Sequence, residues 1–220
     1  MTCWAVLAAG GRGERLGGNR PKAFSRLGDR PLLAESLERL ENSGWVDQIV
    51  AAAPPGWEEP VTLLAEELAC SKVMASVTGG STRSASVRAA MAEVPADAAV
   101  VLVHDAARPL LTEEVIERVL APLSDGWDGA VPVVPVPDTV KRVAGDQVVE
   151  TLDRSELVLA QTPQAFVADV LRAALEAGGD ASDCAALVEA RGGRVKVVEG
   201  DPRLLKVTTP EDLELVAKWL

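Results

Sequence analysis

The sequence predicts a doubly wound, mostly parallel α/β fold, with helices on both faces of one sheet. Short apolar runs alternate with helix-length amphipathic segments along the chain, as is typical of parallel strands joined by crossover helices. Hydrophobic residues make up 48% of the 220 residues, yet only 3% are aromatic and Tyr is absent. An interior of Ala, Val and Leu is normal for such a sheet.

Each element follows from this alternation in chain order. We expect strands at residues 4–9, 48–53, 72–77, 100–104, 129–134, 158–161, 194–199 and 204–207. We expect helices at residues 31–42, 58–69, 82–92, 112–121, 167–177, 182–191 and 210–220. For the last helix, Thr209 is the predicted N-cap and Pro210 the first residue. The length suits a single domain, residues 1–220.

Residues 135–152 interrupt the alternation of strands and helices. Two β-branched runs flank Ala144-Gly145-Asp146-Gln147, a pattern that predicts a β-hairpin. Because an isolated two-stranded hairpin is marginally stable, we expect this arm to pack on something else. A partner subunit is the preferred interpretation, and a flap on its own domain is the alternative.

Charge and cysteine content exclude several classes of protein. A formal net charge of −11 argues against a nucleic-acid or polybasic membrane binder. Three scattered Cys and one His do not form a zinc ligand set; the thiols are expected to be buried in a reducing cytosol, which predicts a cytoplasmic protein. The apolar residues 3–9 are too few for a signal h-region or a membrane span.

Basic residues gather in the glycine-rich segment after the first strand. Residues 12–26 hold Arg12, Arg15, Arg20, Lys22 and Arg26 against the single acid Glu14. Glycines let the backbone approach a ligand, and free N–H groups with cations favour phosphate. The segment therefore predicts a nucleoside triphosphate-binding loop of about 20 residues; the alternative is a solvated turn that happens to be basic.

Two other phosphate motifs are excluded. No Gly-Lys-Ser/Thr tripeptide is present, so the loop is not a P-loop. A dinucleotide fingerprint fails because Leu16 stands at its third glycine position.

Polar residues follow most of the other predicted strands, where ligands bind in open α/β sheets. These strand-end segments are residues 8–10, 78–86, 104–109, 153–154, 161–164 and 206–208. Residues 78–86 are small and rich in hydroxyl groups, and they open a helix whose N–H groups can contact a base edge or an oxyanion.

The motifs at these positions resemble one family, the 2-C-methyl-D-erythritol 4-phosphate cytidylyltransferases of the non-mevalonate isoprenoid pathway. In order they read LAAG…RLG…PKAF, TGGSTRSASV, VHDAARP, DTVKR, TPQAF and KVTTPEDLEL, and they cover essentially the whole chain. The resemblance implies a Rossmann-like nucleotidyltransferase that joins CTP and the polyol phosphate to give a CDP-alcohol and pyrophosphate. It also implies Mg²⁺ carried mainly by the CTP phosphates and a homodimer with exchanged arms.

The same resemblance implies a role for individual residues. The catalytic cations are Arg15, Lys22, Arg154 and Lys206; CTP contacts Ala8, Ala9, Gly10, Gly80, Ser81, Ser86, Asp105 and Ala107; the acceptor contacts Arg108, Thr139, Thr162 and Ser182. No protein metal ligand is expected, with at most some help from Asp105. Arg12 competes with Arg15 for the loop position, and Arg15 is preferred because Arg15-Leu16-Gly17 keeps the local pattern. Ser81 and Ser182 stand where the family often has an acid and a threonine.

The reaction explains these residue types. A phosphate monoester has a second pKa of about 6 and needs no general base at neutral pH, whereas bringing two polyanions together requires cations. His104 is therefore expected to be structural, and the scattered Trp residues to serve in packing. One alternative is a cytidylyltransferase for another polyol phosphate, such as ribitol 5-phosphate. Another is a silent nucleotide-binding domain, which would not need four such cations.

Overall fold

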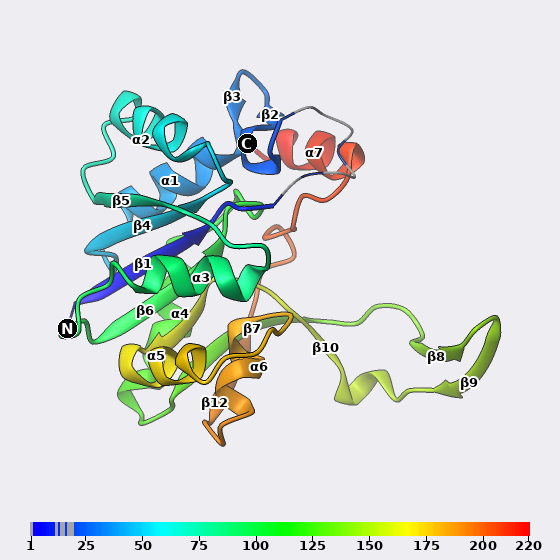
Figure 1. Cartoon of the computed structure of the whole chain (residues 1–220). Helices are drawn as coiled ribbons and strands as arrows, with labels where there is room; N and C mark the ends of the chain where they lie inside the picture. Colours follow the sequence, from blue (N-terminus) through cyan, green and yellow to red (C-terminus); the bar gives the residue numbers. More distant parts are fainter. Residues whose placement is uncertain (1, 12, 14–15, 17–19) are drawn as a thin grey trace.

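A computed structural model describes residues 2–11, 13, 16 and 20–220. Among these residues, eight strands form one central sheet with helices on both faces (Figure 1). The strand order is β10 (Val158–Ala160), β7 (Gly129–Pro135), β11 (Gln164–Val167), β6 (Val100–Asp105), β1 (Cys3–Ala8), β4 (Gln48–Ala53) and β5 (Val73–Thr78), and β12 (Val195–Glu199) also pairs with β7.

The sheet is mostly parallel, as predicted. β1 pairs in parallel with β4 and β6, and β4 pairs in parallel with β5. β11 is antiparallel to both β6 and β7, so β7 runs in the same direction as β6. The carboxyl ends of β1, β4, β5 and β6 therefore lie along one edge, and the chain reverses its direction across the sheet between β1 and β6.

Side chains alternate between two apolar layers. Ala5 and Leu7 of β1 pack in one cluster, and Val6 packs in the other. The first layer contains side chains of α1 (Leu32–Asn42), α2 (Glu58–Glu67) and α4 (Glu113–Ser124). The second contains side chains of α3 (Arg83–Met91), α5 (Ala168–Glu176) and α6 (Cys184–Glu189). The two-sided burial confirms the doubly wound fold.

Two predictions for the C-terminal part are wrong. The strand expected at residues 204–207 does not form; Leu204 and Val207 are buried in extended coil, and Val207 N–H donates to the Ala107 carbonyl at 2.8 Å. Conversely, β11 forms where no strand was expected, inserted between β6 and β7. Helix α7 (Pro210–Ala217) begins as predicted, with Thr209 and Asp212 in a capping box.

The segment between β1 and α1 is not an unbroken loop. It contains the 3-10 helix Lys22–Phe24 and a short antiparallel pair, β2 (Arg26–Leu27) with β3 (Arg30–Pro31). The predicted loop arginine, Arg15, and its competitor Arg12 lie outside the described residues.

The predicted hairpin is present. β8 (Lys141–Ala144) and β9 (Gln147–Thr151) pair as a separate two-stranded sheet, with Gly145 at a positive φ of 57° in the turn. Every residue of both strands is exposed, and the hairpin projects away from the central sheet (Figure 1). We call residues 135–152 the arm.

Two further expectations concern the environment of the chain. The three cysteines are buried and free, as predicted. Within the described residues, no helix is long and apolar enough to cross a membrane.

Candidate active site

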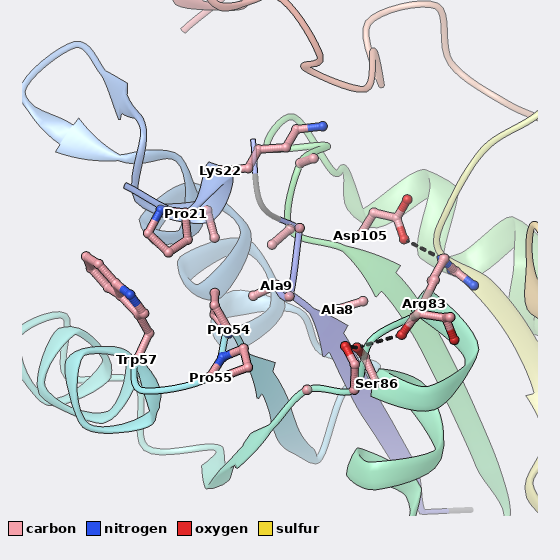
Figure 2. A pocket seen from close by; sticks show the side chains of 18 of the residues that line it. Ala8, Ala9, Pro21, Lys22, Pro54, Pro55, Trp57, Arg83, Ser86 and Asp105 are labelled. Atoms are coloured by element: carbon pink, nitrogen blue, oxygen red, sulfur yellow. Dashed lines mark hydrogen bonds and ion pairs between the residues drawn. The ribbon is translucent and has the colours of Figure 1, made fainter. Parts of the chain in front are cut away.

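A cavity of about 810 Å³ opens at the carboxyl ends of β1, β4, β5 and β6. Figure 2 shows its walls: Trp57, Pro54 and Pro55 lie on one side, and Arg83 and Asp105 on the other. It occupies the point where the strand order reverses, which is the usual ligand position in open α/β sheets. We call it the nucleotide cavity.

Most residues predicted to bind the nucleotide line this cavity. They are Ala8, Ala9, Gly10, Lys22, Gly80, Ser81, Ser86, Asp105, Ala107 and Lys206. The ends of these strands therefore bring together segments that lie far apart in the sequence, as predicted. Lys206 reaches the cavity from extended coil and not from the end of a strand.

The glycine turn before α3 allows the backbone to form one wall of the nucleotide cavity. A Cβ on Gly80 would lie 2.4 Å from the Ala85 Cβ, and one on Gly79 would lie 2.8 Å from the Ala53 carbonyl oxygen. Thr82 caps the helix by accepting a hydrogen bond from Ala85 N–H at 3.1 Å. The turn therefore presents fixed backbone groups and a helix N-terminus to the cavity.

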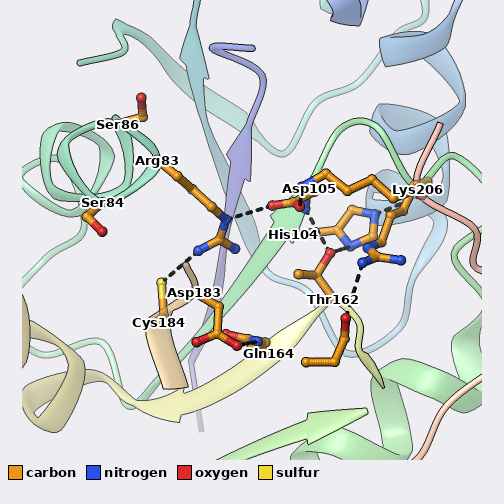
Figure 3. Close-up of polar contacts among 12 residues, drawn as sticks. Arg83, Ser84, Ser86, His104, Asp105, Thr162, Gln164, Asp183, Cys184 and Lys206 are labelled. Carbon is orange, nitrogen blue, oxygen red and sulfur yellow. Dashed lines mark hydrogen bonds and ion pairs between the residues drawn. The ribbon is translucent and has the colours of Figure 1, made fainter. Parts of the chain in front are cut away.

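Asp105 is the electrostatic centre of the site (Figure 3). Its Oδ1 accepts a hydrogen bond from Arg83 Nε at 2.9 Å, and its Oδ2 accepts one from Lys206 Nζ at 2.7 Å. Burial opposes ionisation, but these two cations outweigh it and hold the pKa of Asp105 well below its usual range. The carboxylate is therefore ionised at neutral pH and fixed at both oxygens.

His104 has the structural role expected of it. Its Nε2 lies 3.0 Å from the Arg108 carbonyl, and its Nδ1 lies 3.2 Å from Thr162 Oγ1. Burial lowers the pKa of His104 to about 4, so the ring is neutral at neutral pH. Since a carbonyl can only accept, Nε2 carries the proton and the Thr162 hydroxyl donates to Nδ1. The same hydroxyl accepts from Asp105 N–H at 3.0 Å, which fixes the end of β6.

A second, smaller cavity of about 180 Å³ adjoins the first. It is lined by the predicted acceptor residues Arg108, Thr162 and Ser182, and it shares Arg83, Asp105 and Lys206 with the nucleotide cavity. Arg108 is held by the carbonyls of Leu204 (2.8 Å) and Ala160 (3.3 Å). We call this space the acceptor cavity.

Two predicted residues lie elsewhere. Thr139 and Arg154 are exposed and belong to the arm and its base, and neither lines the nucleotide cavity or the acceptor cavity. Arg154 donates to the Pro137 carbonyl. A single chain thus does not bring these residues to Lys22.

The structure also places residues at the site that sequence reasoning missed. Arg83 joins the two cavities, and the buried Gln164 donates to Asp183 at 2.7 Å in the wall of the acceptor cavity. Trp57 packs on Phe24 with ring centroids 4.5 Å apart, yet it also lines the nucleotide cavity. The sequence does contain a signal for Arg83. A cation in the first turn of a helix is unfavourable because of the helix dipole, so its presence there indicates a role other than helix stability.

In the part of the chain that the structure describes, the protein's own donor groups do not form a metal centre. The described residues contain no group of three His, Cys, Asp or Glu side chains that could hold an ion. Both oxygens of Asp105 already bind cations. A divalent ion at this site would therefore depend on ligands that a substrate supplies.

The mostly parallel sheet and the cation-lined cavity at its switch point define an α/β nucleotidyltransferase. The profile of the 2-C-methyl-D-erythritol 4-phosphate cytidylyltransferase family matches residues 3–220. The chain belongs to this family.

Individual relatives agree with the family match. A 2-C-methyl-D-erythritol 4-phosphate cytidylyltransferase from Frankia casuarinae is 46% identical over 219 residues, covering 98% of this chain and 80% of that protein. One from Nocardia farcinica is 45% identical over 217 residues, covering 98% and 93%. The crystal structure of the Thermus thermophilus enzyme of that name superimposes with a TM-score of 0.78 at 35% identity, covering 97% of this chain and 96% of that one.

Proposed function

We propose that this chain, as one nucleotidyltransferase domain, transfers CMP from CTP to 2-C-methyl-D-erythritol 4-phosphate. The products are 4-diphosphocytidyl-2-C-methyl-D-erythritol and pyrophosphate. The observation that carries the proposal is the pair of adjoining cavities that share Asp105, Arg83 and Lys206 at the switch point of the sheet. The family match favours this acceptor over ribitol 5-phosphate.

In this proposal the nucleotide cavity holds CTP. The base and ribose lie against the backbone of residues 8–10 and the glycine turn, and Ser86 and Ala107 complete the wall. The triphosphate lies beside Lys22, whose 3-10 helix borders the cavity. Arg15 joins it by the sequence argument alone. These cations stabilise the negative charge that develops as pyrophosphate leaves.

The acceptor cavity holds the polyol phosphate. Arg108, Thr162 and Ser182 line it, and Lys206 stands between the two ligands. A phosphate oxygen of the acceptor attacks the α-phosphorus of CTP; the new O–P bond forms as the bond to the β-phosphate oxygen breaks, and the electron pair leaves with pyrophosphate. The attacking phosphate is already ionised at neutral pH, so the protein supplies placement and charge and no base.

Magnesium enters the proposal as an ion that CTP brings with it. Bound to the phosphate oxygens, it would offset their charge, as is usual for phosphoryl transfer. The residues of the site contribute Lys22 and Lys206 as cations beside it.

We further propose a homodimer with exchanged arms. Val143, Val148 and Val149 of the arm are 61%, 54% and 52% exposed, and Val158 and Leu159 at its base are 49% and 50% exposed. Several large apolar side chains exposed on one projecting segment favour an interaction surface there. In the dimer, Thr139 and Arg154 would reach the acceptor bound by the other subunit. Three free thiols support a cytoplasmic, reducing location.

Pyrophosphate release tests the proposed function. CTP with 2-C-methyl-D-erythritol 4-phosphate should give turnover, whereas ribitol 5-phosphate, UTP and ATP should give little. Comparable turnover with UTP or ATP would overturn the nucleotide assignment, and faster turnover with ribitol 5-phosphate would overturn the acceptor assignment.

A further inference from the structure

We propose that Arg83 is a positioning residue for the transfer reaction, which fixes the Asp105 carboxylate between the two cavities and thereby sets the position of Lys206. The inference rests on the proposed function. In this role, the largely buried Arg83 links the nucleotide-binding turn to the acceptor cavity.

The path of the Arg83 side chain supports this role. Arg83 is the first residue of α3, directly after the glycine turn and its Thr82 cap. From there its guanidinium reaches the end of β6, although β1 and β4 lie between β5 and β6 in the sheet. A displacement of the turn would therefore move the Asp105 carboxylate as well.

Arg83 and Lys206 hold the two oxygens of Asp105 in different ways. The Arg83 side chain is 18% exposed, whereas that of Lys206 is 41% exposed. Arg83 is thus the fixed partner, and Lys206 is the cation that a ligand can reach. Arg83 Nη1 also donates to Cys184 Sγ at 3.3 Å; burial raises the pKa of this thiol, so it is a neutral acceptor.

One nitrogen of Arg83 makes no hydrogen bond with the protein. Its Nη2 is buried and has no hydrogen-bond partner among the described residues. Leaving a buried donor unpaired is costly, and the hydrogen bonds to Asp105 and Cys184 are the described contacts that offset this cost.

Arg83 also determines the net charge of the cluster around Asp105. Arg83, Asp105 and Lys206 together carry one net positive charge, whereas Asp105 and Lys206 alone would be neutral. The other groups near Asp105 are neutral His104 on β6, Arg108 on the following turn, and Asp183 and Cys184 at the start of α6. Burial raises the pKa of Asp105, and Arg83 and Lys206 lower it. Without Arg83, mainly Lys206 would offset the effect of burial, so the pKa of Asp105 would rise.

The test compares Arg83→Met with Arg83→Lys, and uses Arg88→Met as a matched control. Arg88 lies on the same helix but donates to the Leu175 carbonyl at 2.9 Å, away from both cavities. In pyrophosphate-release assays, Arg83→Met should lower kcat/KM for the acceptor by about tenfold or more, the usual loss for a charged hydrogen bond.

The control variants separate positioning from folding. Arg83→Lys keeps the charge and should recover most of kcat/KM for the acceptor. Arg88→Met should lower the melting temperature but leave kcat/KM for the acceptor unchanged. If Arg83→Met does not fold, Arg83→Gln replaces it.

Three results would contradict the assignment. The first is an Arg83→Lys variant as impaired as Arg83→Met. The second is a folded neutral variant that keeps the wild-type kcat/KM for the acceptor. The third is failure of both neutral variants to fold, because the role claimed is in a folded protein. Any of these with an active wild-type enzyme overturns the Arg83 assignment alone, whereas absence of turnover in the wild type overturns the proposed function.

Discussion

The nucleotide cavity takes its walls from strand ends that the sheet fixes, whereas β8 and β9 of the arm are exposed along their whole length. At the cavity, Asp105, Arg83 and Lys206 meet at distances of 2.9 and 2.7 Å. On the arm, Arg142 and Glu150 also pair at 2.7 Å, but both side chains are more than half exposed. Such a surface pair contributes little to stability.

The nucleotide cavity forms within one chain, whereas the arm is proposed to act on a second chain. The cavity already holds the groups proposed to bind CTP, and its geometry is set by the fold of a single chain. Thr139 and Arg154 acquire their proposed roles only when a second chain covers the arm. Variants in the two regions should therefore fail in different ways.

The largest expected effect lies at the nucleotide cavity. Lys22→Ala should lower kcat by about 10²–10³, because a preorganised charge at a developing anion is lost. Arg26→Ala is the matched control, since Arg26 is exposed nearby in the same basic segment, and it should change kcat little. Steady-state pyrophosphate release measures both. If Lys22→Ala kept more than about a tenth of kcat, Lys22 would not have its proposed role.

The arm should show a selective defect. Arg154→Ala should raise KM for the acceptor about tenfold or more, because a charged contact to phosphate is lost, while the Kd for CTP stays nearly constant. Arg142→Ala, on the exposed hairpin, should change neither. Calorimetric titration with CTP and initial rates with varied acceptor distinguish the two constants. An equal loss of CTP binding would place Arg154 beside the nucleotide and not the acceptor.

Backbone shape at the cavity should matter less than charge. Gly80→Ala places a Cβ 2.4 Å from the Ala85 Cβ, and overpacking of this kind costs about 1–3 kcal/mol. We expect a melting temperature several degrees lower and a raised KM for CTP. Gly44→Ala meets its nearest atom at 3.5 Å and should be nearly neutral in thermal melts and kinetics. Equal behaviour of the two variants would show that the turn is not tightly constrained.

The smallest effect on turnover at neutral pH is expected at His104, beside the cavities, where acid should lower the stability of the fold. Burial lowers the pKa of folded His104 to about 4, below the unfolded value of about 6.5. The unfolded chain therefore binds more protons between these values, and stability falls as the pH falls from about 6.5 to about 4. The contribution is about 3 kcal/mol. Denaturant unfolding across this range should show a shallower pH dependence for His104→Gln; an unchanged dependence would contradict it.

The sequence predicted the sheet because alternation of apolar runs is a property of local periodicity. It failed where tertiary contacts decide. Leu204 and Val207 have the apolar pattern of a strand, but tertiary packing, for Val207 against α7, buries them without strand pairing. β11 has four residues and lies between two longer strands, so its identity depends on neighbours that are distant in the sequence.

The site was predictable to the same extent. Residues at the ends of parallel strands could be collected from the sequence, because the topology brings them to one edge. Arg83 could not be paired with Asp105 in this way, since the two lie 22 residues apart along the chain and only the folded structure joins them. The proposed roles of Arg154 and Thr139 depend on a second chain, which one sequence does not place.

Subunit complementation tests the crossed-arm site most directly. Lys22→Ala and Arg154→Ala are mixed and allowed to exchange subunits, and they are assayed with the acceptor well below its KM, where each homodimer has low activity. If each site combines Lys22 of one chain with Arg154 of the other, a mixed dimer has one site with both lesions and one with neither. Random exchange should then restore about a quarter of wild-type activity, by the two-fold symmetry of the dimer. No recovery despite demonstrated exchange would place both residues in the same subunit's site and contradict the exchanged-arm dimer.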